Sequence, residues 1–262
     1  MTDSEHDEAR IRRAFRRSLL AIASALLLGL LILLGQRFKQ PASQPIEQRE
    51  TLGPSSVERD TVSAPDLVFT DITSSAGLNF IHVNGAHGER LLPETMGGGI
   101  AFLDFDNDGH QDIVLVNSNN WPWHANTGPP PRSRLYKNDG SGTFKDVTEM
   151  VGFDAILYGM GVAVGDYDGD GYVDVFISAS GNNKLLRNIR GTRFEDATAA
   201  AGVSGANDTW STSAAFFDFD QDGDLDLFVT NYVGWSREID REVDYRLTGI
   251  GRAYGPPTDF SG

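Results

Sequence analysis

The chain of 262 residues contains no cysteine, so neither disulfide bridges nor cysteine-ligated zinc hold its fold together. Histidine is also scarce and scattered, without the pairing that a histidine-based metal site requires. The five histidines are His6, His82, His87, His110 and His124. The G-x-S-x-G pattern of many serine hydrolases is absent as well. These absences disfavour an enzyme, and we assign no catalytic residue.

Basic residues are outnumbered by acidic ones. The chain has 22 lysines and arginines against 37 aspartates and glutamates, and its net charge is −15. Residues 1–39 are the exception, because they hold seven basic and four acidic residues. Nucleic-acid binding rests on lysine and arginine neutralising phosphates. The acidic remainder of the chain therefore predicts no nucleic-acid partner.

Acidic residues are concentrated in one nine-residue motif that occurs three times, at residues 104–112, 166–174 and 218–226. Each copy follows the pattern D-aromatic-D-x-D-G-x-x-D. Carboxylates at positions one, three and five can point at one centre, and glycine at position six permits the turn that brings round the backbone carbonyl of position seven. A fourth carboxylate follows at position nine. The expected ligands are Asp104, Asp106, Asp108, His110 and Asp112, then Asp166, Asp168, Asp170, Tyr172 and Asp174, then Asp218, Asp220, Asp222, Asp224 and Asp226.

Hard oxygen ligands in a flexible loop suit Ca²⁺ better than Mg²⁺, and we expect about three calcium ions, one per loop. An acidic, glycine-rich surface turn is the alternative for a single copy. Three copies with the same internal spacing favour a metal-binding loop over a surface turn. The loops are not EF-hands, because position twelve holds Leu115, Ile177 or Val229 instead of glutamate. These residues lie in short β-branched and aromatic runs that predict strands.

Two further motifs repeat around the loops. F-x-D-x-T occurs at residues 69–73, 144–148 and 194–198, and L-x-[K/R]-N occurs at residues 135–138 and 185–188. Each unit therefore has a glycine-rich strand, the acidic loop, an apolar strand, the L-x-[K/R]-N strand and the F-x-D-x-T strand. Four antiparallel strands at this period predict an all-β fold, a partial β-propeller whose four-stranded blades carry calcium loops.

The predicted propeller occupies residues 67–262. Its blades are expected at about 97–150 and 158–200, with an incomplete blade at 211–262. Two and a half blades do not close a ring, since propellers have about four to eight. We therefore expect a truncated chain and further blades. The isolated F-x-D-x-T motif at 69–73 is expected to complete the last blade of the intact ring.

The N-terminal part predicts a membrane attachment. Residues 1–17 form a basic cytoplasmic segment, and the apolar run 19–35 contains Ser24 as its one polar residue. A transmembrane anchor at 18–36 fits the arginines on its inner side. A cleaved signal sequence, followed by secretion, is the alternative. Residues 37–66 are rich in Pro, Ser, Gln and Glu and predict a flexible linker. Both alternatives place the propeller outside the cytoplasm, in the periplasm or at the cell surface.

The glycine run 97–99, the acidic loops and the L-Y-K-N-x-G motif together resemble the FG-GAP/VCBS repeat proteins. The resemblance extends over about residues 67–262 and is strongest to the cartilage acidic protein-like, ASPIC/UnbV-associated branch, of which the chain would be an N-terminal fragment. The same blades occur in integrin α-chains. The resemblance implies calcium in the acidic loops. The chain differs from these relatives at Tyr254, where they commonly have a cysteine before Gly-Pro. Any cysteine pairing that the relatives use is therefore in doubt for this chain.

Two functions remain open from the sequence. The favoured one is a membrane-anchored, calcium-binding scaffold for binding or adhesion, with a protein or glycan as its ligand. The alternative is a propeller enzyme, of hydrolase or dehydrogenase type, whose active site lies in missing blades or in the central channel. The insertion at residues 119–131 adds Trp121, Trp123 and His124. These rings either form a stacking platform for a ligand or pack over a blade edge.

Overall fold

The computed structural model describes residues 68–124 and 128–261. The expected basic segment, the anchor at 18–36, the linker up to residue 66 and His6 lie outside these ranges. Within the described ranges, no helix has the length and apolar character needed to cross a membrane.

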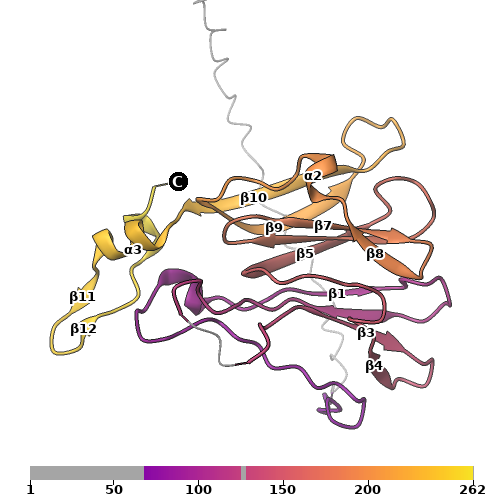
Figure 1. The fold of residues 1–262 in the computed structure, drawn as a ribbon, viewed down its shortest axis with the longest axis horizontal. Helices are drawn as coiled ribbons and strands as arrows, with labels where there is room; N and C mark the ends of the chain where they lie inside the picture. The colour runs from indigo at the N-terminus through magenta and orange to yellow at the C-terminus, as the bar shows by residue number, and fades with distance from the viewer. Residues whose placement is uncertain (1–67, 125–127, 262) are drawn as a thin grey trace, which may run out of the picture. The chain divides into compact units, whose positions relative to one another are not determined.

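Two four-stranded antiparallel sheets form the body of the described part, each with its strands in sequence order (Figure 1). The first sheet contains β1 (Ile100–Leu103), β2 (Asp112–Leu115), β3 (Arg134–Asn138) and β4 (Phe144–Asp146). The second contains β5 (Gly159–Gly165), β6 (Asp174–Ala179), β7 (Lys184–Ile189) and β8 (Arg193–Asp196). The predicted all-β class with four-stranded antiparallel sheets is confirmed, and the arrangement fits a β-propeller-like fold.

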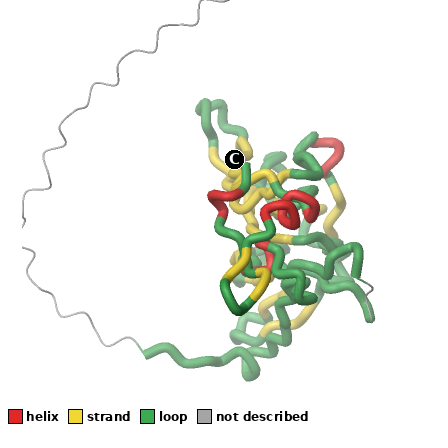
Figure 2. The backbone as a smooth tube through the Cα atoms, turned by 90° about the vertical axis from the view of Figure 1, so that its left-hand side faces the viewer, coloured by secondary structure: helices red, strands yellow, loops and turns green. Residues whose placement is uncertain are grey.

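A two-stranded antiparallel sheet follows, made of β9 (Thr209–Phe217) and β10 (Asp226–Gly234). After β10 the chain enters a short helix, a small hairpin and a final turn. These elements are α3 (Arg237–Val243), β11 (Arg246–Leu247), β12 (Gly251–Arg252) and η2 (Pro257–Asp259). Earlier short helices are η1 (Leu92–Thr95) and α2 (Thr198–Ala201). Figure 2 shows that the helices are brief interruptions in a fold of strands and loops.

Each acidic loop is the connection between the first two strands of a sheet. Leu103 at the end of β1 lies opposite Asp112 at the start of β2, and Gly165 lies opposite Asp174 in the same way. The third loop joins β9 and β10, where Phe217 pairs with Asp226. The strands form because β-branched and aromatic residues precede or follow each loop, and these side chains suit a pleated, half-buried surface.

The main core lies between the first two sheets. It consists of buried apolar side chains from both sheets and from the connection after β4: Leu103, Phe105, Val114, Val116, Leu135, Val147, Val151, Phe153, Ala155, Val175, Ile177, Leu186 and Phe194. A smaller cluster, centred on Phe176 and Leu185, joins the second sheet to β9 and β10. Burial of such side chains is the main favourable term in holding neighbouring sheets together.

Glycines in β5 and immediately before β1 lie where the backbone of a neighbouring segment approaches closely. A Cβ atom on Gly161 in β5 would lie 2.4 Å from the carbonyl oxygen of Thr212 in β9. One on Gly98, just before β1, would lie 2.0 Å from the carbonyl oxygen of Val116. These approaches leave no room for a side chain.

The outer faces of the first and third sheets expose apolar side chains. Ile100 and Phe102 of β1 are each 59% exposed, and Phe228 of β10 is 57% exposed. In each case the alternate residues of the strand point into a core, as the two-residue period of a strand requires.

The F-x-D-x-T motif at 69–73 forms no strand, although the segment that follows it contacts the first sheet. The backbone N–H of Phe144 donates to the carbonyl of Ala76 at 2.8 Å. One repeat later, Phe194 donates to Val151 at 2.7 Å in the same manner. Residues 69–77 therefore precede the first sheet as residues 144–152 precede the second. Phe69 is 93% exposed.

Candidate metal-binding loops

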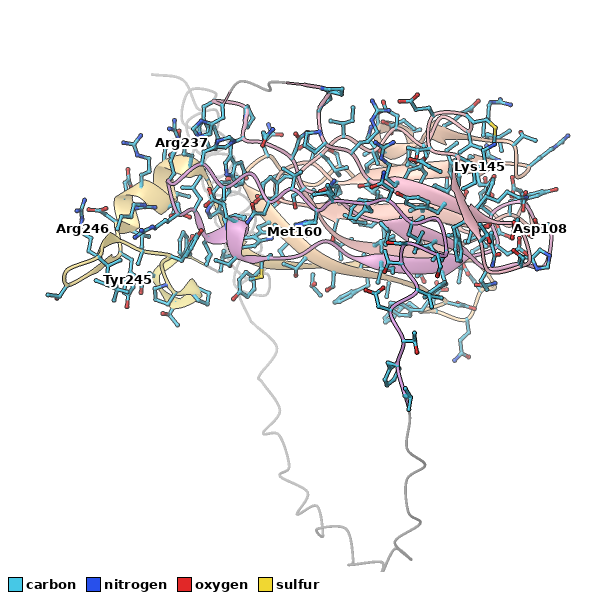
Figure 3. All side chains as sticks on the ribbon, turned by 90° about the horizontal axis from the view of Figure 1, so that it is seen from below. Asp108, Lys145, Met160, Arg237, Tyr245 and Arg246 are labelled. Atoms are coloured by element: carbon cyan, nitrogen blue, oxygen red, sulfur yellow. The ribbon has the colours of Figure 1, made fainter. Side chains whose placement is uncertain are left out.

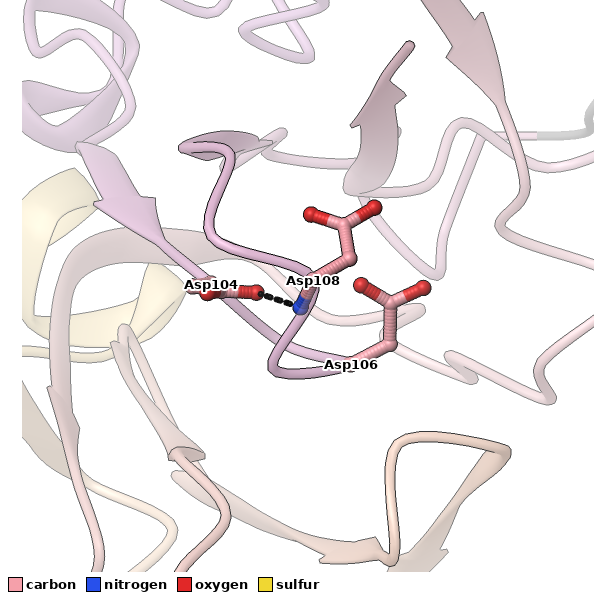
Figure 4. A group of neighbouring side chains, drawn as sticks. All are labelled: Asp104, Asp106 and Asp108. Atoms are coloured by element: carbon pink, nitrogen blue, oxygen red, sulfur yellow. Dashed lines mark hydrogen bonds between the residues drawn. The ribbon is translucent and has the colours of Figure 1, made fainter. Parts of the chain in front are cut away.

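The first aspartate of each loop organises the turn through its carboxylate. In the first loop, Asp104 accepts hydrogen bonds from the backbone N–H groups of Asp108 at 3.0 Å and Gly109 at 2.8 Å (Figure 4). Asp166 accepts from Asp170 and Gly171 at 3.0 and 2.8 Å. In the third loop Asp218 accepts from Gln221 at position four, instead of position five, and from Gly223, at 2.6 and 3.1 Å.

Left-handed backbone at two positions makes this turn possible. The fourth residue of each loop has positive φ, as does the glycine at position six. The values are 57° and 87° for Asn107 and Gly109, 68° and 88° for Gly169 and Gly171, and 64° and 96° for Gln221 and Gly223. Glycine adopts this conformation without steric cost, which explains its place in all three copies.

The aspartate at position nine closes the loop. Asp112, Asp174 and Asp226 each accept a hydrogen bond from the backbone N–H of position two, at 3.1, 3.1 and 2.8 Å. In the first two loops the other carboxylate oxygen accepts from the third strand, from Asn138 at 2.8 Å and Asn188 at 2.6 Å. Position nine thus ties each of these loops to its sheet.

Carboxylate oxygens converge in each loop to within 4.8 Å of one another. The groups are Asp104, Asp106 and Asp108; Asp166, Asp168 and Asp174; and Asp218, Asp220 and Asp226. Among residues 68–124 and 128–261, these are the groups of three His, Asp or Glu side chains close enough to hold one ion. Six of the fifteen predicted ligands stand outside these groups: the aspartates Asp112, Asp170 and Asp222, and the position-seven residues His110, Tyr172 and Asp224, which the sequence predicts to act through the backbone carbonyl.

The backbone N–H of the residue at position seven has the same partner in all three loops. Each N–H donates to the carboxylate at position five. The bonds are His110 to Asp108 at 2.9 Å, Tyr172 to Asp170 at 3.0 Å and Asp224 to Asp222 at 2.9 Å. This bond holds the position-five carboxylate at the turn, where Asp108 belongs to the converging group and Asp170 and Asp222 do not.

The first loop fits a cation by one specific measure. Oδ1 of Asp106 is shielded from solvent and accepts no hydrogen bond. A buried carboxylate oxygen without a partner carries a desolvation cost that a bound cation would offset. Carboxylate oxygens are hard ligands of the kind that Ca²⁺ prefers.

A basic side chain from the third strand reaches into each of the first two loops. Lys137 of β3 pairs with Asp106 and lies 2.8 Å from Asp108. Arg187 of β7 pairs with Asp168 and lies 3.6 Å from Asp170. The motif L-x-[K/R]-N marked these residues, but the sequence did not place them at the loops. We call Lys137 and Arg187 the loop cations.

These pairs shift the pKa values of the groups involved. The hydrogen bond from Lys137 lowers the pKa of Asp108, and the carboxylates raise the pKa of Lys137. Asp168 raises the pKa of Arg187. At position nine, burial raises the pKa of Asp112 and that of Asp174, the latter to about 6.

The third loop differs in having no third strand beside it within the described residues. All members of its group are exposed. Asp226 lacks the bond from a neighbouring strand that holds Asp112 and Asp174, and no loop cation reaches Asp218, Asp220 or Asp226 in the part of the chain that the structure describes.

The tryptophans of the insertion pack against protein. Trp121 is 4% exposed, and its ring centroid lies 4.1 Å from that of Tyr158 and 4.9 Å from that of Trp235. Trp123 stacks on Trp121, and the guanidinium of Arg237 lies 4.5 Å from the centre of the Trp123 ring. Of the two alternatives for this insertion, the geometry therefore matches packing over a sheet end.

The remaining histidines take part in local contacts. His87 and His124 stack with their centroids 4.2 Å apart, and His124 lies 3.0 Å from Glu89. His82 lies 3.5 Å from Ser118, and burial lowers its pKa.

Comparisons with known proteins agree with the repeats found in the sequence. A family model described as an FG-GAP-like repeat matches residues 104–177 and again residues 166–229. The chain is also 34% identical over 142 residues to Cartilage acidic protein 1 of Xenopus tropicalis. That alignment covers 52% of this chain and 20% of the relative, so the chain spans about a fifth of the relative's length. Neither match is described as an enzyme.

Proposed function

Since this chain belongs to the FG-GAP-like repeat proteins, we propose that it is a calcium-stabilised scaffold for binding or adhesion. The observation that carries the calcium assignment is the convergence of three carboxylates in each of three loops. The shielded and unpartnered Oδ1 of Asp106 supports it independently. Repeated acidic loops at the same point of three sheets favour a stabilising role over a catalytic one.

The residues that would hold the ion are the converging aspartates of each loop. Bound Ca²⁺ would supply positive charge among carboxylates that otherwise repel one another. Hydrogen bonds within the chain hold the loop in place. Asp104 and Asp166 hold the turn amides, while Asp112 and Asp174 fix the loop to the third strand. Binding energy at the loop is therefore coupled to the stability of the whole sheet.

Neighbouring loops are also coupled to each other. The side-chain amide of Asn107 in the first loop donates to the carbonyl of Gly171 in the second at 2.9 Å. The side-chain amide of Asn188 donates to the carbonyl of Phe105 at 2.7 Å. An ordered loop thus supports the next sheet, and calcium would stiffen the surface formed by adjoining sheets.

We place this scaffold outside the cytoplasm, where calcium is abundant. The apolar segment 18–36 would attach it to a membrane, or would direct secretion if it is cleaved. Membrane fractionation of the full chain checks this part of the proposal: recovery in the membrane fraction supports the anchor, and recovery of a shortened chain in the medium supports cleavage.

The calcium assignment is tested by calorimetric titration of the full chain and of Asp168→Ala. The full chain is expected to bind one ion per loop. Asp168→Ala should lose one ion and keep the others, because Asp168 belongs to the group of the second loop alone. Asp154→Ala is the matched control, since Asp154 is an exposed aspartate outside the loops. An unchanged number of ions in Asp168→Ala would refute the assignment.

A further inference from the structure

Arginines gather around a cavity at the end of the described chain, outside the residues that the family model matches. The cavity measures about 450 Å³. Its charged walls are Arg237, Arg241, Arg246 and Arg252 together with Glu89 and Asp244. Four positive charges thus face two negative ones, in a chain whose net charge is −15. We call this cavity the arginine pocket.

Two of its arginines are fixed by internal bonds. Arg252 donates to the buried carboxylate of Asp240 at 2.5 Å and to the backbone carbonyl of Glu89 at 2.8 Å. Arg237 donates to both carboxylate oxygens of Glu89, at 3.0 and 2.9 Å, and lies over the ring of Trp123. These residues make a preformed wall, and preorganisation lowers the entropic cost of binding.

The wall is anchored deep in the protein. Asp240 is 1% exposed and also accepts hydrogen bonds from the indole N–H of Trp235 at 2.7 Å and the backbone N–H of Leu92 at 2.8 Å. These contacts join α3 to a segment almost 150 residues earlier. The pocket is therefore part of the folded structure and does not depend on a loose terminal segment.

The other two arginines are available to a ligand. Arg241 is exposed, and no described residue forms a hydrogen bond or an ion pair with it. Arg246 is 64% exposed in its side chain and pairs with Asp244 at 2.7 Å. Such surface pairs contribute little stability and exchange readily for another anion. Arg241 and Arg246 thus offer guanidinium donors whose planar geometry matches an oxyanion.

The chemistry of the pocket selects among anionic ligands. Besides the charged side chains it is lined by Gly88, so no aliphatic or aromatic side chain forms its wall. A peptide ligand usually anchors through an apolar side chain in a pocket, which this wall does not provide. Oε2 of Glu89 accepts one hydrogen bond, from Arg237, and a carboxylate oxygen can accept a second; this atom and the carboxylate of Asp244 can therefore accept hydrogen bonds from hydroxyl groups beside the oxyanion.

We propose that the arginine pocket binds an acidic saccharide, with its carboxylate or sulfate on Arg241 and Arg246 and its hydroxyls on Glu89 and Asp244. The inference rests on the proposed binding role and adds the class of ligand. It is physically separate from the calcium loops. Figure 3 shows Arg237 and Arg246 at one end of the described part and Asp108 at the opposite end.

The test is calorimetric titration of the full chain with three short oligosaccharides: one of uronic acids without sulfate, one of neutral sugars carrying sulfate, and the neutral parent. At least one acidic probe should bind, and the neutral parent should not. The double variant Arg241→Ala/Arg246→Ala should weaken binding about tenfold or more, as expected for the loss of charge-assisted hydrogen bonds. Arg193→Ala is the control, because Arg193 is an exposed arginine on β8, paired only with Glu195.

The two acidic probes distinguish carboxylate from sulfate as the bound group. Failure of both to bind, or equal binding by the double variant, would overturn the inference. Tighter binding of a polyglutamate peptide at the same arginines would overturn the saccharide assignment. Calcium titration of the double variant separates this inference from the proposed function: an unchanged number of ions leaves the calcium assignment intact whatever the sugars do.

Discussion

Asp112 and Asp174 illustrate how one residue type serves two purposes within the loops. The sequence predicts both as metal ligands from their spacing, yet both are fully buried and bonded to one backbone amide of the loop and one of the third strand. Asp174 still contributes an oxygen to its converging group, whereas Asp112 does not. The position-nine aspartate is therefore first a structural residue, and its role toward a metal depends on small differences between loops.

The loop cations give a prediction for a single residue. Lys137 occupies carboxylates that calcium would use, so its positive charge opposes the ion. Lys137→Gln should increase the calcium affinity of the first loop by about fivefold, which corresponds to about 1 kcal/mol of relieved repulsion and competition. Calcium titration of the variant measures this change.

Lys145→Gln is the matched control for this substitution. Lys145 on β4 lies directly opposite Lys137 and is exposed. Its substitution by Gln removes the same charge as Lys137→Gln. Its substitution should leave the affinity nearly unchanged. Equal effects of the two substitutions, or weaker calcium binding by Lys137→Gln, would contradict the competition between Lys137 and the ion.

At this scale the sequence indicates that acids converge within each loop, but it predicts neither the exact members nor their counter-charges. Asp108 at position five belongs to its group, whereas Asp170 and Asp222 at the same position do not. The contact of Lys137 with the first loop depends on the register between β2 and β3, which the insertion at residues 119–131 separates in the sequence. No local pattern encodes that register.

Among the elements, the first strand of each sheet shows most clearly how packing restricts sequence. Three consecutive glycines precede or open β1, and they are not equivalent. A Cβ atom on Gly98 would lie 2.0 Å from the carbonyl oxygen of Val116, whereas one on Gly97 would meet nothing within 4 Å. Neither has positive φ, so space alone distinguishes them.

Gly98→Ala should therefore destabilise the chain by about 1–3 kcal/mol, because the added methyl group forces the backbone of β1 and β2 apart. Gly97→Ala, the adjacent control, should be neutral or slightly stabilising. Chemical denaturation of both variants measures the difference. Equal stability of the two would show that the close approach of Gly98 to Val116 does not limit this strand.

Elements near a repeat could be predicted, and elements far from one could not. The strands of the two complete sheets follow from short apolar runs and repeated motifs. The association of α3 with Leu92 through Asp240 links residues 148 apart, and no pattern in the sequence announces it. The arginine pocket is a product of that association.

Across the whole described part, the acidic charge is concentrated at the same structural position of each sheet. The three loops place aspartates where the first two strands of each sheet meet, and neighbouring loops are joined by Asn107 and Gly171. Without a counter-ion this arrangement opposes folding through repulsion, which Lys137 and Arg187 relieve in two loops. Calcium would relieve it in all three, and most in the exposed third loop.

The most direct measurement is the melting temperature of the full chain in excess calcium and in excess chelator, at equal ionic strength. A ligand that binds the folded state alone raises the melting temperature. The account predicts a clear rise with calcium and a much smaller one with magnesium, which fits a flexible oxygen site poorly. Melting that is indifferent to both calcium and chelator would contradict the central claim that these loops are metal sites that hold the sheets together.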